Sequence, residues 1–181
     1  TTSAVYIAFA ADRVATEGGL RGLPIEVVPA VIYVCCGLFG FTGLLSARAK
    51  AAVGLPVLLR ILMLSGAVSL ALVALAPGHW AGMIASAGLQ GIHIMMTSAV
   101  LAFWSERLYP TLPSLSLTAA LLAMATGSTV GPATAGLLSD AHGAESMFLA
   151  AAILPALLAV GLRGRHVLER PGKPRVSETG T

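Results

Sequence analysis

The chain has 181 residues, of which 56% are apolar and only 10% are charged. Because an ordinary soluble domain carries about 25% charged residues, this composition predicts an integral membrane protein and excludes a disordered chain. The formal net charge of +3 is informative mainly through the positions of the charges. The two cysteines, Cys35 and Cys36, are adjacent, so we expect neither a disulfide framework nor a CxxC metal or redox site.

Long uncharged segments predict an all-α integral membrane protein, a six-helix bundle with five complete spans and one partial span. A span needs about 20 mostly apolar residues, and the uncharged segment 61–105 is long enough for two, separated by a turn at Pro77-Gly78. The strands of a transmembrane barrel would instead alternate over about ten residues. The predicted spans are residues 1–14, 26–47, 55–76, 80–104, 112–138 and 145–163, within a bundle of residues 1–163.

The two ends of the chain carry further expectations. Residues 164–181 form a polar tail with several basic residues, which we expect to be disordered. The first span is short and the chain begins with Thr1 rather than methionine. We therefore interpret the sequence as a fragment, or as one half of something longer.

The basic residues predict how the bundle lies in the membrane. When the spans are counted along alternating sides, nine of the eleven basic residues fall on one side. The positive-inside rule then makes that side and the C-terminal tail cytoplasmic, as in a multi-pass protein of the cell (inner) membrane. The nine are Arg48, Lys50, Arg60, Arg107, Arg163, Arg165, Arg170, Lys173 and Arg175, whereas Arg13 and Arg21 lie on the other side.

A four-residue string occurs twice, as Gly43-Leu44-Leu45-Ser46 and as Gly136-Leu137-Leu138-Ser139. The copies are 93 residues apart, which is about three spans with their loops, and each ends a glycine-rich span. Their predicted positions on opposite membrane faces favour an inverted three-helix repeat. The alternative is a chance match between common residues.

Three segments carry recognisable motifs. The segment from Gly43 to Arg48 has the pattern G-x-L-x-x-R, with Ala47 at the fifth position. The segment 127–140 contains G-x-x-x-G-P followed by G-x-L-x-D, and the segment 105–110 is a short stretch that ends in proline. Together they resemble the C-terminal six-helix half, helices seven to twelve, of a major facilitator superfamily transporter. There the first segment corresponds to the cytoplasmic G-x-L-A-D-R loop, in which Ala47 takes the acidic position, the second to the end of helix eleven and the third to the loop after helix ten.

The resemblance implies alternating-access transport of a small-molecule substrate by two six-helix bundles that rock around a site in mid-membrane. The other bundle would be a missing N-terminal half or a second copy of this chain. A proton gradient is the expected energy source, because the sequence has no nucleotide-binding loop. Besides the substrate and the lipid bilayer we expect no nucleic-acid partner, no cofactor, no metal and no catalytic residue.

Two other classes of function were weighed against transport. The chain could be a non-transporting membrane sensor or assembly protein, or an inactive truncated half. An intramembrane enzyme has less support, because the string closest to a Gly-x-Ser-Gly nucleophile, Gly40-Phe41-Thr42-Gly43, lacks serine. No H-E-x-x-H zinc motif occurs either.

Polar residues inside predicted spans are candidates for a substrate or ion pathway, because polar groups are costly in a bilayer. Gln90, His93 and Thr97 have the spacing i, i+3, i+7 and share one helical face. His93 is a candidate proton carrier or substrate ligand, and Gln90 a candidate hydrogen-bond donor and acceptor. The structural alternative is a neutral histidine that hydrogen-bonds across a helix interface. Tyr33 is a further candidate substrate ligand.

Asp12 is a candidate whose role depends on where the first span ends. If the span extends through Asp12 and Arg13, the carboxylate could couple transport to protons, or the two residues could form an internal ion bridge. If the span ends before them, both are surface charges, which is the interpretation that we favour.

Several small residues predict close helix packing or bending. Gly37 and Gly40 share a face of the second span with Tyr33, and close packing is the favoured role for both glycines. A proline in a membrane helix is tolerated when neighbours satisfy the freed backbone, so Pro132, with Gly127 and Gly131, predicts either a gating bend or simple close contact.

Overall fold

The computed structural model describes residues 2–108 and 113–161, and these residues form helices and short turns without a strand. The all-helical fold predicted from the sequence is thus confirmed for the described ranges, and the predicted tail 164–181 lies outside them. The helices are α1 (Thr2–Thr16), α2 (Val28–Gly40), α3 (Ser46–Val53), α4 (Leu55–Leu75), α5 (Trp80–Leu108), α6 (Pro113–His142) and α7 (Ala144–Gly161), with short 3-10 helices at Ile25–Val27 (η1) and Phe41–Leu45 (η2).

Glycine and proline set the positions where helices begin and end. Gly54 has a φ of 78° and separates α3 from α4, and Pro56 occupies the first turn of α4, where a missing N–H costs no hydrogen bond. Gly143, with a φ of 85°, allows the chain to reverse between α6 and α7. These local signals divide the chain into long helices with very short connections.

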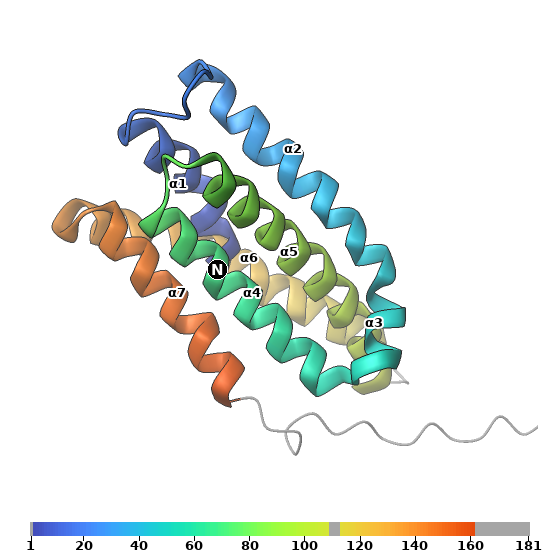
Figure 1. Cartoon of the computed structure of the whole chain (residues 1–181). Coiled ribbons are helices and arrows are strands. Elements are labelled where there is room, and N and C mark those ends of the chain that lie inside the picture. The colour runs from blue at the N-terminus through green and yellow to red at the C-terminus, as the bar shows by residue number, and fades with distance from the viewer. Residues whose placement is uncertain (1, 109–112, 162–181) are drawn as a thin grey trace, which may run out of the picture.

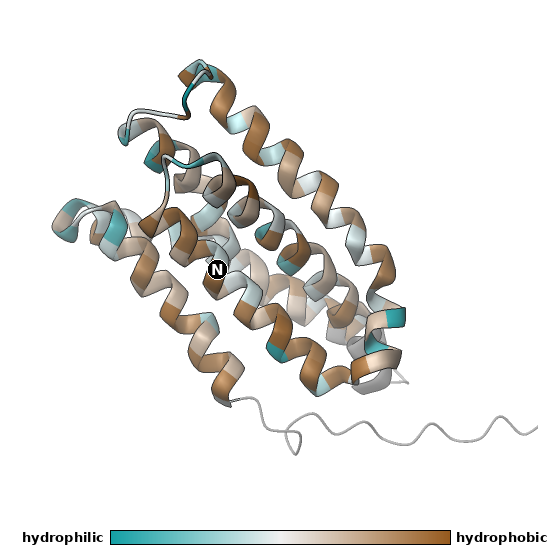
Figure 2. Cartoon of the chain, viewed as in Figure 1, coloured by the Kyte–Doolittle hydropathy of each residue, from teal (hydrophilic) through white to brown (hydrophobic). Residues whose placement is uncertain are grey.

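Five segments are long and apolar enough to cross a membrane. At about 1.5 Å per residue, the 21 residues of α4 match a hydrocarbon core of about 30 Å. Figure 2 shows apolar residues along the outer surfaces of the helices, with polar residues mostly near the ends of the bundle. These features support a multi-pass membrane protein. The five segments are Ile25–Val53, Leu55–Leu75, Trp80–Ala102, Leu117–His142 and Ala144–Gly161.

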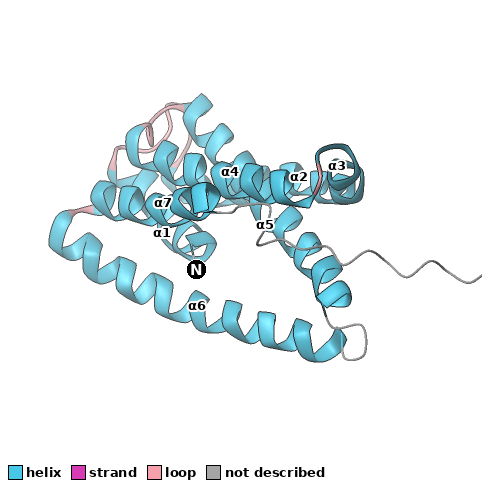
Figure 3. Ribbon diagram, turned by 90° about the horizontal axis from the view of Figure 1, so that it is seen from below, coloured by secondary structure: helices cyan, strands magenta, loops and turns pink. Residues whose placement is uncertain are grey.

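The helices form two layers (Figures 1 and 3). In the first layer α2 contacts α5, α5 contacts α4, and α4 contacts α7. The shorter α1 packs against this layer, and α6 lies on the other side of α1 (Figure 3). The N-terminus of α1 lies part-way along the bundle rather than at one of its ends (Figure 1).

Small residues bring α2 and α5 into close contact. A Cβ atom on Gly91 would lie 2.1 Å from the carbonyl oxygen of Cys36, and one on Gly40 would lie 2.9 Å from Cγ of Met95. The close packing expected at Gly37 is not found, because a Cβ atom there would meet no atom within 4 Å. The close contact therefore involves Gly40 but not Gly37.

The segment expected to be a loop between the second and third spans is helical. Gly43 lies in η2, where a Cβ atom would approach Cβ of Met95 to 3.0 Å, and Arg48 is an exposed residue of α3. The second span thus continues from α2 through η2 into α3. The repeat copies at 43–46 and 136–139 lie toward opposite ends of the bundle (Figure 1), while an inverted-repeat relationship stays a prediction.

Candidate functional site

A stripe of polar side chains runs along the face of α5 that is turned toward α1 and α4. Three of its members, Gln90, His93 and Thr97, were predicted from their spacing, and Ser86 extends the same face by one turn. Gln90 is 1% exposed and His93 6% exposed, although both are polar. We refer to Ser86, Gln90, His93 and Thr97 as the α5 polar stripe.

His93 is held in place by α4. Its Nδ1 lies 2.7 Å from the carbonyl oxygen of Leu62. Because a carbonyl only accepts, Nδ1 carries the proton, and Nε2 of the neutral ring is an acceptor. Gly66 makes room for the ring, since a Cβ atom there would lie 3.0 Å from Nδ1. The helix-interface bond foreseen as the structural alternative for His93 is therefore present, and it leaves the opposite ring edge free.

Two members of the stripe have buried polar atoms without a partner among the described residues. These atoms are Oε1 and Nε2 of Gln90 and Oγ1 of Thr97. A buried polar group that lacks a hydrogen bond costs about 1–3 kcal/mol. Buried polar groups of this kind are rare in native proteins, so each one needs an explanation such as a functional role or an ordered water.

His93 and Thr97 line a cavity of about 250 Å³ between α1, α5 and α6. His93 is close to the midpoint of the 29-residue helix α5, so the cavity lies near the middle of that helix. It is partly open, because Ile7, Met124 and Ser128 on its wall are exposed. We call it the α5–α6 cavity. Its walls are formed by Ser3, Ala4, Ile7, His93, Ile94, Thr97, Ser98, Leu101, Met124 and Ser128. Gln90 is not among them and lies one turn away from His93 along α5.

A second polar cluster, which the sequence did not reveal, joins α1, α4 and α5. Ser69 and Ser86 each place Oγ 2.8 Å from the other's backbone carbonyl oxygen. The Tyr6 hydroxyl lies 3.2 Å from Oγ of Ser86, and all three side chains are buried. One indication of this cluster is present in the sequence, because Ser69 and Ser86 are polar residues inside uncharged spans. Serine is common in such spans, however, and nothing in the spacing of these two residues predicts that they pair.

The other predicted pathway residues do not line this cavity. Tyr33 is half exposed, and its hydroxyl donates to the carbonyl of Ile7 at 3.3 Å. α1 extends through Asp12, whose side chain is exposed. Arg13 pairs with Glu17 and lies 3.9 Å from Glu145, so no ion bridge joins Asp12 to Arg13.

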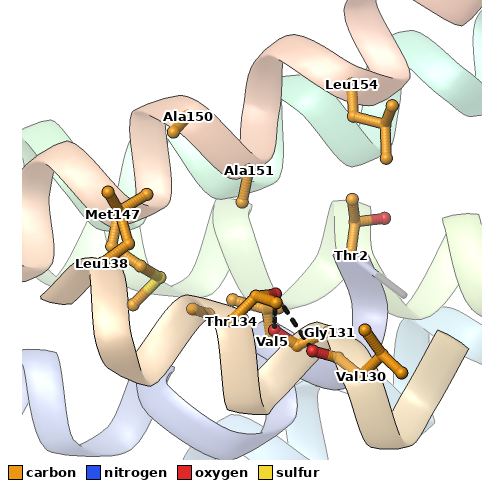
Figure 4. A pocket seen from close by; sticks show the side chains of 11 residues that line it. Thr2, Val5, Val130, Gly131, Thr134, Leu138, Met147, Ala150, Ala151 and Leu154 are labelled. Carbon is orange, nitrogen blue, oxygen red and sulfur yellow. Dashed lines mark hydrogen bonds between the residues drawn. The ribbon is translucent and has the colours of Figure 1, made fainter.

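A larger cavity of about 300 Å³ lies between α1, α6 and α7, and it is almost wholly apolar (Figure 4). Thr134 is one of its few polar wall residues, and its hydroxyl donates to carbonyls of its own helix, 3.0 Å from Val130 and 2.9 Å from Gly131. Gly131 lines this cavity, while Gly127 and Pro132 are half-buried positions of an α6 that continues through the proline. Gly127, Gly131 and Pro132 therefore affect the shape of α6 and of the cavity wall, but their side chains supply no hydrogen bonds.

The charged residues of α1, α6 and α7 gather at one end of the bundle, opposite α3. Arg13 also donates from Nη2 to the carbonyl of Ala74 at the end of α4, at 3.2 Å. Trp80 donates from Nε1 to the carbonyl of Arg21 at 3.1 Å, which ties the turn before α5 to the connection after α1.

Comparison with protein-family models, curated proteins and solved structures finds no match to the chain.

Proposed function

We propose that the chain is one half of a secondary transporter that moves a small molecule by alternating access, in the manner of the major facilitator superfamily. One observation carries the proposal. A partly open cavity near the middle of an apolar helical bundle is lined by His93 and Thr97, on a helix that buries unsatisfied polar atoms. Polar groups at such depth mark substrate or ion pathways.

The α5–α6 cavity is the proposed substrate site. His93 contributes a hydrogen bond to the substrate and is also the proposed proton carrier, because Nε2 of the neutral ring can take up a proton. Gln90, one turn away from His93 along α5, is the proposed donor and acceptor of further hydrogen bonds to the substrate. Asp12 and Tyr33 are assigned no part in this site, because they lie outside the cavity.

The rest of the proposal concerns the assembly. A second six-helix bundle, either another half or a second copy, would complete the pathway and rock against this one. The end of the bundle with α3 and the basic residues Arg48 and Lys50 would face the cytoplasm of the cell (inner) membrane, together with the C-terminus.

The test is flux into proteoliposomes that contain the full natural protein, under an imposed pH gradient. The panel consists of polyols, sugars, amino acids and lipophilic cations, and His93→Ala is compared with wild type. His79→Ala is the matched control, because His79 is exposed at the turn before α5. We expect flux of at least one solute, reduced at least tenfold in His93→Ala and unchanged in His79→Ala.

Two outcomes would count against the proposal. Flux that His93→Ala leaves untouched would keep transport but remove His93 from the pathway. A folded protein that moves no solute of the panel would favour a membrane sensor or assembly protein.

A further inference from the structure

Three of the polar wall residues of the α5–α6 cavity, Ser98, Ser128 and His93, offer hydrogen-bond acceptors. Ser98 donates its hydroxyl proton to the carbonyl of Ile94, and Ser128 donates to that of Ala125, both at 2.8 Å. The oxygens of these two wall residues are left as acceptors. Nδ1 of His93 is used by Leu62, so the ring edge that remains for the cavity carries the acceptor Nε2.

Thr97 differs from the threonines of α6. Thr118, Thr126 and Thr134 each donate to the carbonyl four residues earlier. Oγ1 of Thr97 is buried and has no such bond. It can therefore donate as well as accept, one helical turn from His93.

Charge is missing from the walls of the cavity within the described residues. The remaining wall residues are mostly apolar, with Ile7, Ile94, Leu101 and Met124 among them. An ion without a charged partner would be strongly disfavoured in such surroundings. The volume of about 250 Å³ lies just below the range of about 300–1,000 Å³ that is typical of drug-sized ligands.

From this arrangement we infer that the α5–α6 cavity binds a small uncharged molecule with one or more hydroxyl groups on an apolar frame. A ligand hydroxyl donates to Nε2 of His93 and accepts from Oγ1 of Thr97, while the frame packs against the apolar wall. The inference rests on the proposed function for its role as a substrate site, but binding can be measured without transport.

Three probes of one size separate the possible ligand classes. Cyclohexanol has a hydroxyl donor, cyclohexanone only an acceptor, and cyclohexylammonium a charged donor. Binding of each is measured by saturation-transfer NMR with the full natural protein in lipid nanodiscs, and empty nanodiscs correct for partition into lipid. We expect cyclohexanol to bind about fivefold more tightly than cyclohexanone, as expected for one hydrogen bond, and more tightly than cyclohexylammonium.

Two variants then place the hydroxyl in the cavity. His93→Asn keeps a nitrogen near the position of Nδ1, for the bond to Leu62, but removes the acceptor at Nε2. Thr97→Val keeps the side-chain shape and removes the hydroxyl. His93→Asn is expected to abolish most of the preference for cyclohexanol over cyclohexanone. Thr97→Val is expected to weaken the binding of both about fivefold and to leave the preference in place, because the oxygen of either ligand can accept from Oγ1. Thr126→Val is the control, because Thr126 is exposed on α6 and bonded to its own helix.

The wild-type comparison decides the ligand class even if a variant fails to fold. Equal or tighter binding of cyclohexanone or cyclohexylammonium overturns the inference, and so does the absence of cyclohexanol binding. A preference for cyclohexanol that survives in folded His93→Asn also overturns it, and so does unchanged binding of both ligands in folded Thr97→Val. Cyclohexanol binding without flux would refute transport alone, whereas flux of charged solutes only would refute the ligand class alone.

Discussion

The α-carbon of Gly91 on α5 faces the carbonyl oxygen of Cys36 on α2 so closely that a Cβ atom would lie 2.1 Å from that oxygen. Helices in a membrane associate largely through close van der Waals packing, and small residues such as glycine make this close contact possible. The obstacle is backbone rather than a flexible side chain, so it cannot move aside without moving α2.

Gly91→Ala is therefore expected to separate the two helices and destabilise the bundle by about 3 kcal/mol, at the upper end of the usual cost of overpacking. Gly37→Ala is the control on α2, and it should change stability by less than about 0.5 kcal/mol. Unfolding by sodium dodecyl sulfate, followed by circular dichroism, measures both. Equal effects of the two variants would show that the close contact is not formed.

Tyr6→Phe removes one hydroxyl from the buried cluster with Ser69 and Ser86. Interhelical hydrogen bonds in membrane proteins contribute on average about 0.6 and at most about 1.7 kcal/mol, and we expect a loss in that range. Tyr33→Phe is the matched control, since Tyr33 is half exposed and its hydroxyl makes a slightly longer bond, of 3.3 Å. The prediction fails if Tyr33→Phe costs as much as Tyr6→Phe in the same unfolding assay.

Arg13→Gln is expected to loosen the end of the bundle at which α1, α4 and α7 meet. The guanidinium is 12% exposed, and it donates to a carbonyl at the C-terminus of α4, where a cation is favourable by up to about 2 kcal/mol. Hydrogen exchange at Glu17 and Glu145 should rise in this variant. Arg21→Gln, at an exposed position, should leave exchange at both residues unchanged.

Asp12→Asn should leave transport as it is in wild type, including its dependence on the pH gradient. The reason is that Asp12 is exposed on α1 and does not line the α5–α6 cavity. The proteoliposome flux assay checks this directly. A loss of proton coupling in Asp12→Asn would restore this carboxylate as the coupling group and displace His93 from that role.

Cysteine labelling tests the orientation of the bundle. In a background with Cys35 and Cys36 replaced by alanine, His79→Cys and Ala47→Cys each introduce a thiol at an exposed position, at opposite ends of α4. A membrane-impermeant maleimide should label His79→Cys in intact cells, and Ala47→Cys only after permeabilisation. The reverse pattern would invert the bundle, and labelling of both from one side would contradict the count of spans.

The order of the helices and one face of the candidate site were predictable from sequence. Uncharged runs set the helices, and the spacing of Gln90, His93 and Thr97 put them on one face of α5. The partners of that face were not predictable, because Leu62 and Gly66 meet His93 only through the register between α4 and α5. Residues 43–48 illustrate a second limit, since Arg48 marks the predicted end of a span but does not determine whether the backbone stays helical.

The hydroxyl groups of α6 have a consequence for movement within the bundle. Thr118, Thr126, Thr129 and Thr134 all donate to carbonyls of α6 itself, and Ala135 is the one fully buried position among the α6 side chains described. Displacing α6 along its neighbours would therefore break none of these hydrogen bonds. In α1, α4 and α5, by contrast, the hydrogen bonds among Tyr6, Ser69 and Ser86 join different helices, and a comparable displacement there would break them.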